Sequence, residues 1–258
     1  MPGALFSLHG ATVEAGGATL LHPLDLDLPA GGVLGLIGHN GSGKSTLLRT
    51  LARQMTPSRG SVLFMGRPLP DWTRRDLARH LAFMPQDPAI DGAVTVRDLV
   101  EAGRFPWHGT LGRFTARDRA AVDSALARTG VAALADRAMG TLSGGERQRA
   151  AIALCLAQEP RCLLLDEPTA ALDVRHAVSV LALVRSLARD GIASVVVLHD
   201  VNLAARFCDE LLALRGGRVL ARGTPDALMR PEVLESIYGT RLEVVPHPSG
   251  GPPVAVLP

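Results

Sequence analysis

The strongest constraint on this chain is a glycine-rich stretch, GLIGHNGSGKST, which covers residues 35–46. The apolar run VLGLI at 33–37 overlaps its start and has the character of a buried parallel strand. Leucines at 47, 48 and 51 follow it at helical spacing. A strand, a loop of the pattern G-xxxx-GKS and a helix are the context of a P-loop, whose backbone N–H groups enclose phosphate oxygens at a helix N-terminus. The stretch therefore predicts a binding site for a nucleoside triphosphate.

The residue types of this loop have distinct roles in such a site. Glycines let the backbone close around phosphate, Lys44 is expected to reach the β- and γ-phosphates, and the Ser45 hydroxyl is expected to hold Mg²⁺. An ordinary glycine-rich turn is the alternative, and it is disfavoured because the required strand and helix are both present. The residues expected to contact the nucleotide are Gly38, His39, Asn40, Gly41, Ser42, Gly43, Lys44, Ser45 and Thr46.

Composition is that of an ordinary globular protein. Hydrophobic residues make up 47% and charged residues 20% of the 258 residues, enough for a substantial core in one or two domains. A net charge of +2 without a dense Lys/Arg tract gives no indication of a nucleic-acid partner. No apolar run approaches the ~20 residues that cross a bilayer, and the N-terminus lacks a signal-peptide pattern. Any membrane role is therefore expected to involve a separate partner chain.

The cysteine pattern points to a reducing compartment. Cys155, Cys162 and Cys208 are odd in number, widely spaced and set in apolar segments. We expect them to be reduced core residues of a cytosolic protein.

Periodicity divides the chain into strand-rich and helical parts. We expect residues 1–87 and 160–258 to form an α/β core, with a helical insertion at 88–159, all within a single domain. Thr115-x-x-Asp118 predicts a capping box at the start of one inserted helix. The tail HPSGGPPVAVLP has no predicted structure. The expected strands are 61–66, 80–87, 162–169 and 194–200, the hairpin is 211–223, and the expected helices are 74–81, 96–104, 116–127, 146–158, 175–190 and 201–206.

Two acids and a second glycine-rich turn extend the predicted site. Asp166 and Glu167 end an apolar run, with Asp166 placed for the Mg²⁺ shell and Glu167 placed to polarise an attacking water. Ser143-Gly144-Gly145 opens a helix and predicts a second anion site made of backbone N–H groups. Because one γ-phosphate needs only one P-loop, we expect this second site to serve a nucleotide held by another copy of the chain.

Gln86 and His199 each lie close to the end of a predicted strand. A position there suits a catalytic side chain, but taken alone such a residue is more often a satisfied polar loop residue. Their residue types leave both interpretations open.

In order and spacing, these motifs resemble those of the ATP-binding cassette (ABC) family over essentially the whole chain. GHNGSGKS is similar to Walker A, Gln86 to the Q-loop, LSGGERQ to the signature motif, LLLDEP to Walker B, residues 171–173 to the D-loop, and His199 to the switch histidine. The resemblance implies an α/β P-loop NTPase with a RecA-like core sheet, an antiparallel β subdomain and an inserted helical subdomain.

The same resemblance implies roles for individual residues. It implies MgATP hydrolysis with Glu167, His199 and Gln86 as catalytic residues and Mg²⁺ at Ser45, Gln86 and Asp166. It also implies a head-to-tail homodimer that encloses two ATP molecules. Across that interface the nucleotide would be faced by Ser143, Gly144, Gly145 and Asp173.

Less universal stretches resemble the ATPases of type II importers for iron siderophores and cobalamin, and above all those of ferric hydroxamate importers. Among these stretches are LLHPLDLDLPAG, GRFPWHGTLGRF and LLALRGG. This implies a peripheral subunit on the cytoplasmic face of the inner membrane. Its partners would be a polytopic permease and a substrate-binding protein. Other cargoes (haem, cobalamin, another siderophore) stay open, as does a non-transport ABC ATPase. Glu167 and His199 disfavour a non-enzymatic binding module, and the lack of an apolar span disfavours an exporter.

Two features fall outside the general pattern. Ala15 stands where many family members carry an aromatic residue that stacks on adenine, an interaction worth ~1–3 kcal/mol. We therefore expect weak base preference unless another side chain, such as His9 or His22, covers the base. Phe105, Trp107 and Phe114 cluster in GRFPWHGTLGRF, either as a small core that fastens this loop or as a docking surface for the permease.

Overall fold

The structure is a computed structural model that describes residues 4–109, 112–248 and 250–258. The chain forms two compact units, of which unit 1 combines residues 1–71 with 185–258 and unit 2 comprises residues 72–184. The expected limits of the helical insertion, 88 and 159, both fall inside unit 2 and stay a prediction.

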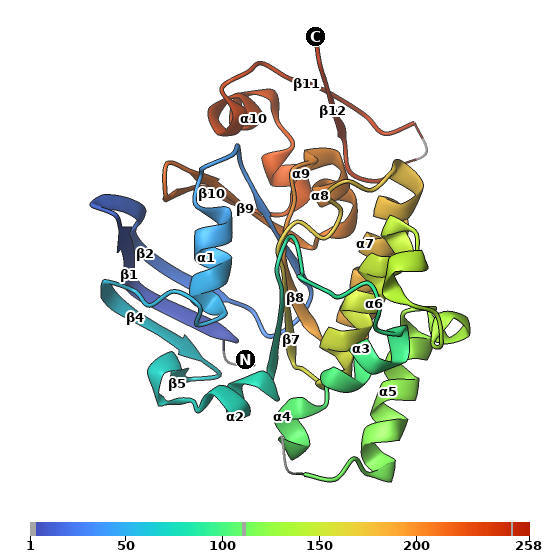
Figure 1. The fold of residues 1–258 in the computed structure, drawn as a ribbon. Coiled ribbons are helices and arrows are strands. Elements are labelled where there is room, and N and C mark those ends of the chain that lie inside the picture. Colours follow the sequence, from blue (N-terminus) through green and yellow to red (C-terminus); the bar gives the residue numbers. More distant parts are fainter. Residues whose placement is uncertain (1–3, 110–111, 249) are drawn as a thin grey trace. The chain divides into compact units, whose positions relative to one another are not determined.

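Unit 1 opens with an antiparallel sheet of strand order β2-β1-β4-β5 (Figure 1). In β2, Leu24, Leu26 and Leu28 are buried while Asp25 and Asp27 are exposed, the alternation of a strand with one buried face. This alternation gives the sheet one apolar face. The strands are β1 (Phe6–Ala15), β2 (Ala18–Leu28), β4 (Arg59–Phe64) and β5 (Arg67–Pro68).

The second set of strands in unit 1 positions the P-loop. β3 (Val33–Ile37) lies between two parallel neighbours, β8 (Ala193–Val197) and β9 (Glu210–Arg215). Every residue of β3 and β8 is buried, which explains their continuous apolar sequences. β9 turns back through Gly216-Gly217 into antiparallel β10 (Arg218–Gly223), which confirms the predicted hairpin.

Unit 1 ends with two short strands, of which the second lies in the tail HPSGGPPVAVLP, where the sequence pattern predicts no element. β11 (Glu243–Val245) pairs with β12 (Val254–Val256). Asn202 binds β12 through two hydrogen bonds. Its side-chain amide donates to the Ala255 carbonyl (2.9 Å), and its Oδ1 accepts from the Ala255 N–H (2.7 Å). The helices of unit 1 are α1 (Lys44–Leu51), α8 (Val201–Phe207), α9 (Pro225–Leu228) and α10 (Pro231–Tyr238), with a 3₁₀ turn at Leu69–Asp71.

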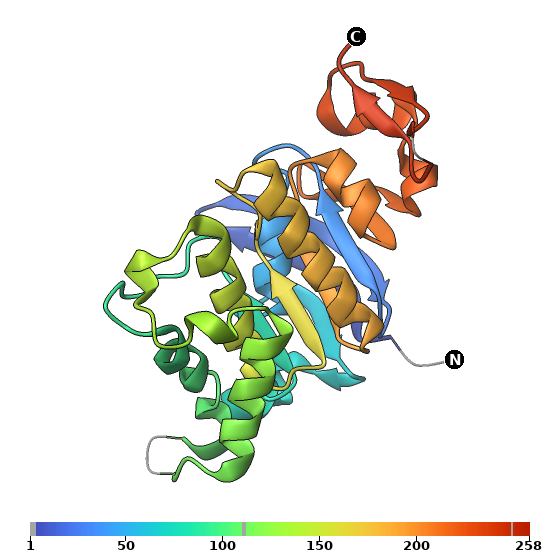
Figure 2. The same ribbon diagram turned by 90° about the vertical axis from the view of Figure 1, so that its right-hand side faces the viewer.

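Unit 2 combines two parallel strands, β6 (Leu81–Met84) and β7 (Cys162–Leu165), with a group of helices. α3, α5 and α6 pack on one another, and both ribbon views show them together (Figures 1 and 2). The predicted capping box of Thr115 and Asp118 is confirmed at α5. The helices are α2 (Arg74–Ala78), α3 (Val96–Ala102), α4 (Phe105–His108), α5 (Ala116–Arg128) and α6 (Gly144–Ala157), with 3₁₀ turns at Ala132–Leu134 and Met139–Thr141; α7 (Val174–Arg189) starts in unit 2 and ends in unit 1.

A buried arginine ties together the helical part of unit 2. Arg104 is 1% exposed; its Nε donates to Asp118 (2.9 Å), and its Nη1 donates to the Ala157 carbonyl (2.7 Å) and to Glu159 (2.8 Å). Burial acts to raise the pKa of Asp118, but hydrogen bonds from Thr115 and Arg104 and the charge of Arg104 outweigh it and lower that pKa to about 2. Breaking such a pair strands a buried charge at a cost of about 3–5 kcal/mol.

The stretch GRFPWHGTLGRF contains a short helix, α4, where a loop was expected. Pro106 in its first turn is compatible with a helix start. Arg75 and Arg79 hold the helix from outside, because each donates to the Pro106 carbonyl (2.8 and 2.9 Å). These donors lie about thirty positions earlier in the chain, so local sequence carries no sign of them. Thr110 and Leu111 of this stretch lie outside the described residues.

All three cysteines are buried and none forms a disulfide, as expected for reduced core residues. Burial raises the pKa of the Cys155 and Cys208 thiols to about 12. It raises the pKa of Cys162 further still above its usual value.

Candidate nucleotide-binding and catalytic site

The P-loop of unit 1 has the geometry of a phosphate cradle. It joins the buried end of β3 to α1, and Gly38, Gly41 and Gly43 take positive φ angles of 138°, 74° and 102°. At Gly38 no side chain fits, because a Cβ would lie 2.2 Å from the Leu214 carbonyl oxygen. The buried Lys44 donates from Nζ to the carbonyls of Gly38 (2.8 Å) and His39 (3.0 Å). The ammonium is thus held over the loop, where a phosphate chain would lie.

His199 lies at the same sheet edge as the P-loop. β3 and β8 are parallel neighbours, and the Leu198 N–H donates to the Leu36 carbonyl (3.0 Å), so their carboxyl ends meet. His199 is exposed there, just before Asp200, which caps α8. Ligands of open α/β sheets bind at this edge. Unit 1 therefore brings two of the predicted site elements together.

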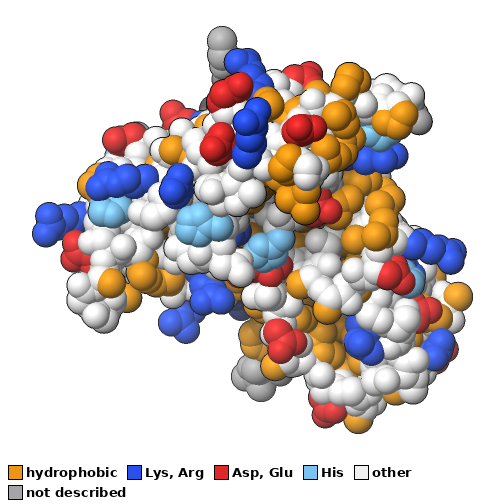
Figure 3. Space-filling model, turned by 90° about the horizontal axis from the view of Figure 1, so that it is seen from above, with side chains coloured by type: hydrophobic (Ala, Val, Ile, Leu, Met, Phe, Trp, Pro, Cys, Tyr) orange, Lys and Arg blue, Asp and Glu red, His pale blue; other side chains and the backbone are white. Residues whose placement is uncertain are grey.

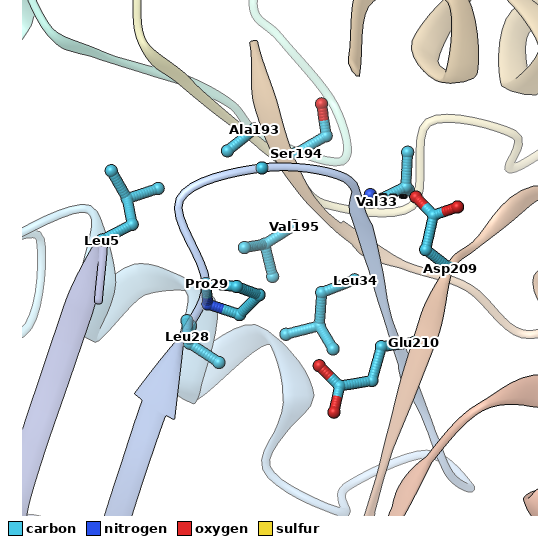
Figure 4. Close-up of a pocket in the computed structure, with 11 residues that line it drawn as sticks. Leu5, Leu28, Pro29, Val33, Leu34, Ala193, Ser194, Val195, Asp209 and Glu210 are labelled. Atoms are coloured by element: carbon cyan, nitrogen blue, oxygen red, sulfur yellow. Dashed lines mark hydrogen bonds between the residues drawn. The ribbon is translucent and has the colours of Figure 1, made fainter. Parts of the chain in front are cut away.

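A small cavity of unit 1 lies at the opposite end of the same strands (Figure 4). It measures about 50 Å³, and Pro29, Leu34 and Val195 are among its lining residues. Next to it the Asp209 carboxylate accepts from the Val33 N–H (2.8 Å) and pins the start of β3. This cavity is at the wrong end of β3 to hold a nucleotide, because the P-loop follows the carboxyl end of that strand.

In unit 2 the structure brings Gln86 and Glu167 into contact. β6 and β7 end side by side, where the Asp166 N–H donates to the Met84 carbonyl (2.9 Å). Gln86 Nε2 then donates to Glu167 Oε2 (2.8 Å). Glu167 has a φ of 50°, a left-handed conformation that costs a side-chain-bearing residue roughly 1–3 kcal/mol and is concentrated at functional sites. The strained backbone and the bond from Gln86 together fix where the carboxylate points.

The predicted Mg²⁺ ligands have suitable chemistry. A serine hydroxyl (Ser45), an amide oxygen (Gln86) and a carboxylate (Asp166) are hard oxygen ligands of the kind that Mg²⁺ prefers. Because the amide nitrogen of Gln86 is directed to Glu167, its oxygen is the atom left to face a cation. Ser45 belongs to unit 1, whereas Gln86 and Asp166 belong to unit 2, and their joint site stays a prediction.

The signature motif begins α6 with a complete capping box. The Ser143 N–H and hydroxyl both donate to Glu146 Oε2 (2.8 Å each). These bonds lower the pKa of Glu146. In the single chain the Ser143 proton is therefore directed to Glu146, and a phosphate arriving at this helix N-terminus would compete with Glu146 for it.

A histidine that was not identified from the sequence joins the D-loop to the signature motif. His176 donates its backbone N–H and its ring Nδ1–H to Asp173 Oδ1 (2.8 Å each), which lowers the pKa of Asp173. A Cβ at Gly145 would lie only 2.4 Å from Cδ2 of the same imidazole. Glycine at 145 is thus required by packing within this chain. The available sequence signal was the Asp173-x-x-His176 spacing at the start of a helix.

A cavity of about 550 Å³ opens in unit 2 beside these residues. Gln86, Gly144 and Leu172 all line it, so it adjoins the Q-loop, the signature helix and the D-loop. Ile90 and Met139 add an apolar wall. A partner segment that enters this cavity would touch Gln86, which is bonded directly to Glu167.

Comparison with known proteins decides the family. A family model described as ABC transporter matches residues 21–170, more than half of the chain. The chain belongs to the ABC transporter family. This ABC ATPase is 46% identical to the hemin import ATP-binding protein HmuV of Streptomyces coelicolor, over 94% of its own length and 86% of that protein. It is 41% identical to the ferric enterobactin transport ATP-binding protein FepC of Escherichia coli, over 95% and 91%.

A solved structure agrees with this assignment. The ABC ATPase superposes on cbiO1 from Clostridium perfringens, part of the ABC transporter complex cbiONQ, with a TM-score of 0.80. The match covers 91% of this chain and 94% of that chain at 29% identity. The predicted α/β P-loop fold and ATP hydrolysis are thereby confirmed, while the roles of individual residues stay predictions.

Proposed function

We propose that this ABC ATPase energises the import of an iron chelate through a separate membrane permease. The observation that carries the proposal is the identity with HmuV and FepC, which exceeds 40% along nearly the whole chain. One relative is named for hemin and the other for ferric enterobactin, and both cargoes are iron chelates. Ferric hydroxamate siderophores are the proposed cargo, on the resemblance of stretches such as GRFPWHGTLGRF. Hemin is the second candidate, favoured by the 46% identity with HmuV.

In the proposed reaction a water attacks the γ-phosphorus of ATP, and ADP and inorganic phosphate leave. Lys44 and the P-loop N–H groups hold the phosphates, and Glu167 orients the water and takes its proton. Gln86 keeps that carboxylate in position through its 2.8 Å bond. We propose that His199 contacts the γ-phosphate, which is supported by its position at the sheet edge that also carries the P-loop. Mg²⁺, held by Ser45, Gln86 and Asp166, would neutralise charge on the phosphates.

The proposed working form is a head-to-tail dimer. The chain carries two loops of the kind that bind phosphate, the P-loop before α1 and the signature motif before α6, and this pair of loops supports the proposal. In the dimer the signature motif of one chain would close on the nucleotide held by the P-loop of the other. In the single chain the Ser143 hydroxyl donates to Glu146. In the proposed dimer the same hydroxyl would donate to the γ-phosphate instead.

Growth on single iron sources tests the cargo. A strain that lacks this gene is supplied under iron limitation with a ferric hydroxamate, hemin or ferric enterobactin. We expect complementation by the wild-type chain to restore growth on the hydroxamate, with Lys44→Ala as the inactive control. Restoration on hemin alone would select the second candidate. Equal growth of deletion and complemented strains on every source would contradict iron-chelate import.

The three clustered aromatic residues Phe105, Trp107 and Phe114 differ in their surroundings. Trp107 is fastened within the chain, because its Nε1 donates to the Gln158 carbonyl (3.0 Å) and the guanidinium carbons of Arg79 and Arg104 lie 5.1 and 4.9 Å from its ring centroid. Phe105 is 54% exposed. The small-core interpretation therefore fits Trp107 and also Phe114, whose ring packs edge-on against His108 with centroids 5.8 Å apart. Phe105 is the exposed aromatic that we propose to contact a permease. No helix among the described residues is long and apolar enough to span a membrane.

Two alanine variants separate these roles. Phe105→Ala is expected to leave the melting temperature and basal ATPase of the isolated subunit unchanged, while it lowers permease-stimulated ATPase in the reconstituted complex. Trp107→Ala removes a hydrogen bond and cation–π contacts and is expected to destabilise the chain by about 1–3 kcal/mol. Thermal unfolding and reconstituted ATPase assays provide the readouts. Wild-type stimulation in Phe105→Ala would exclude Phe105 as a permease contact.

A further inference from the structure

The P-loop accounts for the triphosphate of ATP but not for its base. The hairpin tip between β1 and β2 has the sequence EAGGAT at 14–19 and offers no ring, with Ala15 directly opposite Ala18. A nucleotide held at the P-loop places a planar aromatic base, with polar edges and stacking faces, one ribose away from its phosphates. A base without a partner would remain in water, so another planar side chain beside the P-loop is the natural place to look.

The P-loop is flanked by Leu21 of β2 and Gly217 of the β9–β10 turn. A Cβ at Gly43 would lie 3.0 Å from Leu21 Cδ2 and 3.3 Å from Gly217 Cα. Two backbone bonds continue this contact, from the Gly217 N–H to the Ser42 carbonyl (3.0 Å) and from the His22 N–H to the Gly217 carbonyl (2.9 Å). The wall of the phosphate site is therefore built from these two segments.

His22 and Arg218 are the next residues along each segment, and their side chains meet. Arg218 Nη2 lies 2.9 Å from His22 Nδ1. An arginine only donates, so Nδ1 of His22 is the acceptor in this contact. The pair joins a guanidinium plane to an imidazole plane. In the space-filling view, histidine side chains occur together with Lys and Arg side chains on the left of the face shown (Figure 3).

The other histidines considered for this role are placed differently. His9 pairs with Ser61 of β4, on the edge of β1 that faces away from β2. His39 belongs to the P-loop itself, and its Nδ1 donates to the Asn40 carbonyl (2.7 Å), which ties the ring to the loop. The structure thus favours His22 over His9, a choice that the sequence left open.

We propose that His22 and Arg218 form the surface on which the base of bound ATP stacks. The proposal rests on the P-loop as the phosphate site. Imidazole and guanidinium planes both stack on nucleobases, and such stacking tolerates any base because every base has a π-face. ATP and GTP are therefore expected to bind with affinities within roughly tenfold of each other.

Calorimetry on the full chain tests this assignment, with Glu167→Gln as the background to prevent hydrolysis. ATP, GTP and inorganic tripolyphosphate are titrated separately, since tripolyphosphate carries the phosphates without a base. The double variant His22→Ala/Arg218→Ala is expected to weaken ATP and GTP by roughly tenfold or more and to leave tripolyphosphate unchanged. His22→Phe keeps a stacking plane and is expected to retain ATP affinity. His9→Ala and Arg59→Ala, exposed residues of β1 and β4, are the matched controls.

The outcomes are distinguishable. Unchanged ATP affinity in the double variant would overturn the proposal, as would an equal loss for tripolyphosphate, which would indicate an effect on the phosphates. A failure of the P-loop assignment gives another pattern, in which Lys44→Ala binds both ATP and tripolyphosphate as the parent chain does. Circular dichroism of each variant confirms that it is folded. If the double variant fails to fold, Ala15→Tyr in the parent chain decides, since it should tighten ATP only slightly where His22 and Arg218 already cover the base, and by roughly tenfold where they do not.

Discussion

Glu167→Gln chains are expected to bind ATP and to accumulate as closed dimers that barely turn over. A glutamine amide cannot take the proton of the attacking water, and general-base catalysis contributes about 10²–10⁴-fold to rate. The substitution keeps the shape of the side chain and leaves an amide oxygen to accept the 2.8 Å bond from Gln86. The left-handed φ of 50° at this position is equally available to glutamine. Binding should therefore survive while chemistry fails.

Phosphate release and size exclusion with MgATP measure these two effects. Glu232→Gln, an exposed acid in the first turn of α10, is the matched control and should behave as wild type in both assays. A Glu167→Gln chain that hydrolyses ATP at the wild-type rate would remove Glu167 from the mechanism.

A second large effect is expected from mixing two inactive chains in one tethered dimer. Lys44→Ala damages the P-loop, and Ser143→Arg fills the signature turn at the start of α6. In a head-to-tail dimer both lesions fall on one nucleotide, and the other nucleotide meets an intact P-loop and an intact signature motif. One ATP should therefore be trapped per tethered dimer when both chains also carry Glu167→Gln. If each chain used its own signature motif, no undamaged site would exist.

The control places the same two lesions in a single chain tethered to an unmutated partner. In the head-to-tail arrangement each nucleotide then meets one lesion, so no ATP should be trapped. Bound nucleotide is counted after rapid desalting. Trapping in this control but not in the mixed dimer would reverse the geometry and place each site within one chain.

Local patterns predicted the parts of this ABC ATPase whose causes are local. The P-loop follows from glycines at fixed spacing between a buried strand and a helix, and the Thr115–Asp118 box from three-residue spacing at a helix start. Continuous apolar runs placed β3 and β8 in the interior. These features depend on neighbours in sequence, so the sequence alone was sufficient.

The features that were missed depend on residues far apart in the chain. α4 is held by hydrogen bonds that Arg75 and Arg79 donate to the Pro106 carbonyl, and β12 is held by Asn202, which lies 53 positions before Ala255. The bond from Gln86 to Glu167 spans 81 positions. Asp118 was expected only as a cap, yet it is also the buried partner of Arg104. Spacing within one helix or loop contains no information about such partners.

The buried cysteines make this protein convenient for site-specific chemistry. The thiolate is the reactive form of cysteine, and a thiol whose pKa is about 12, as at Cys155 and Cys208, is ionised in only about one molecule in 10⁵ at pH 7. Cys162 is buried as well. A single cysteine introduced at an exposed position such as Phe105 would therefore be the preferred target of a maleimide dye or crosslinker. Distance measurements across the transport cycle then require no cysteine-free background, and the native core stays intact.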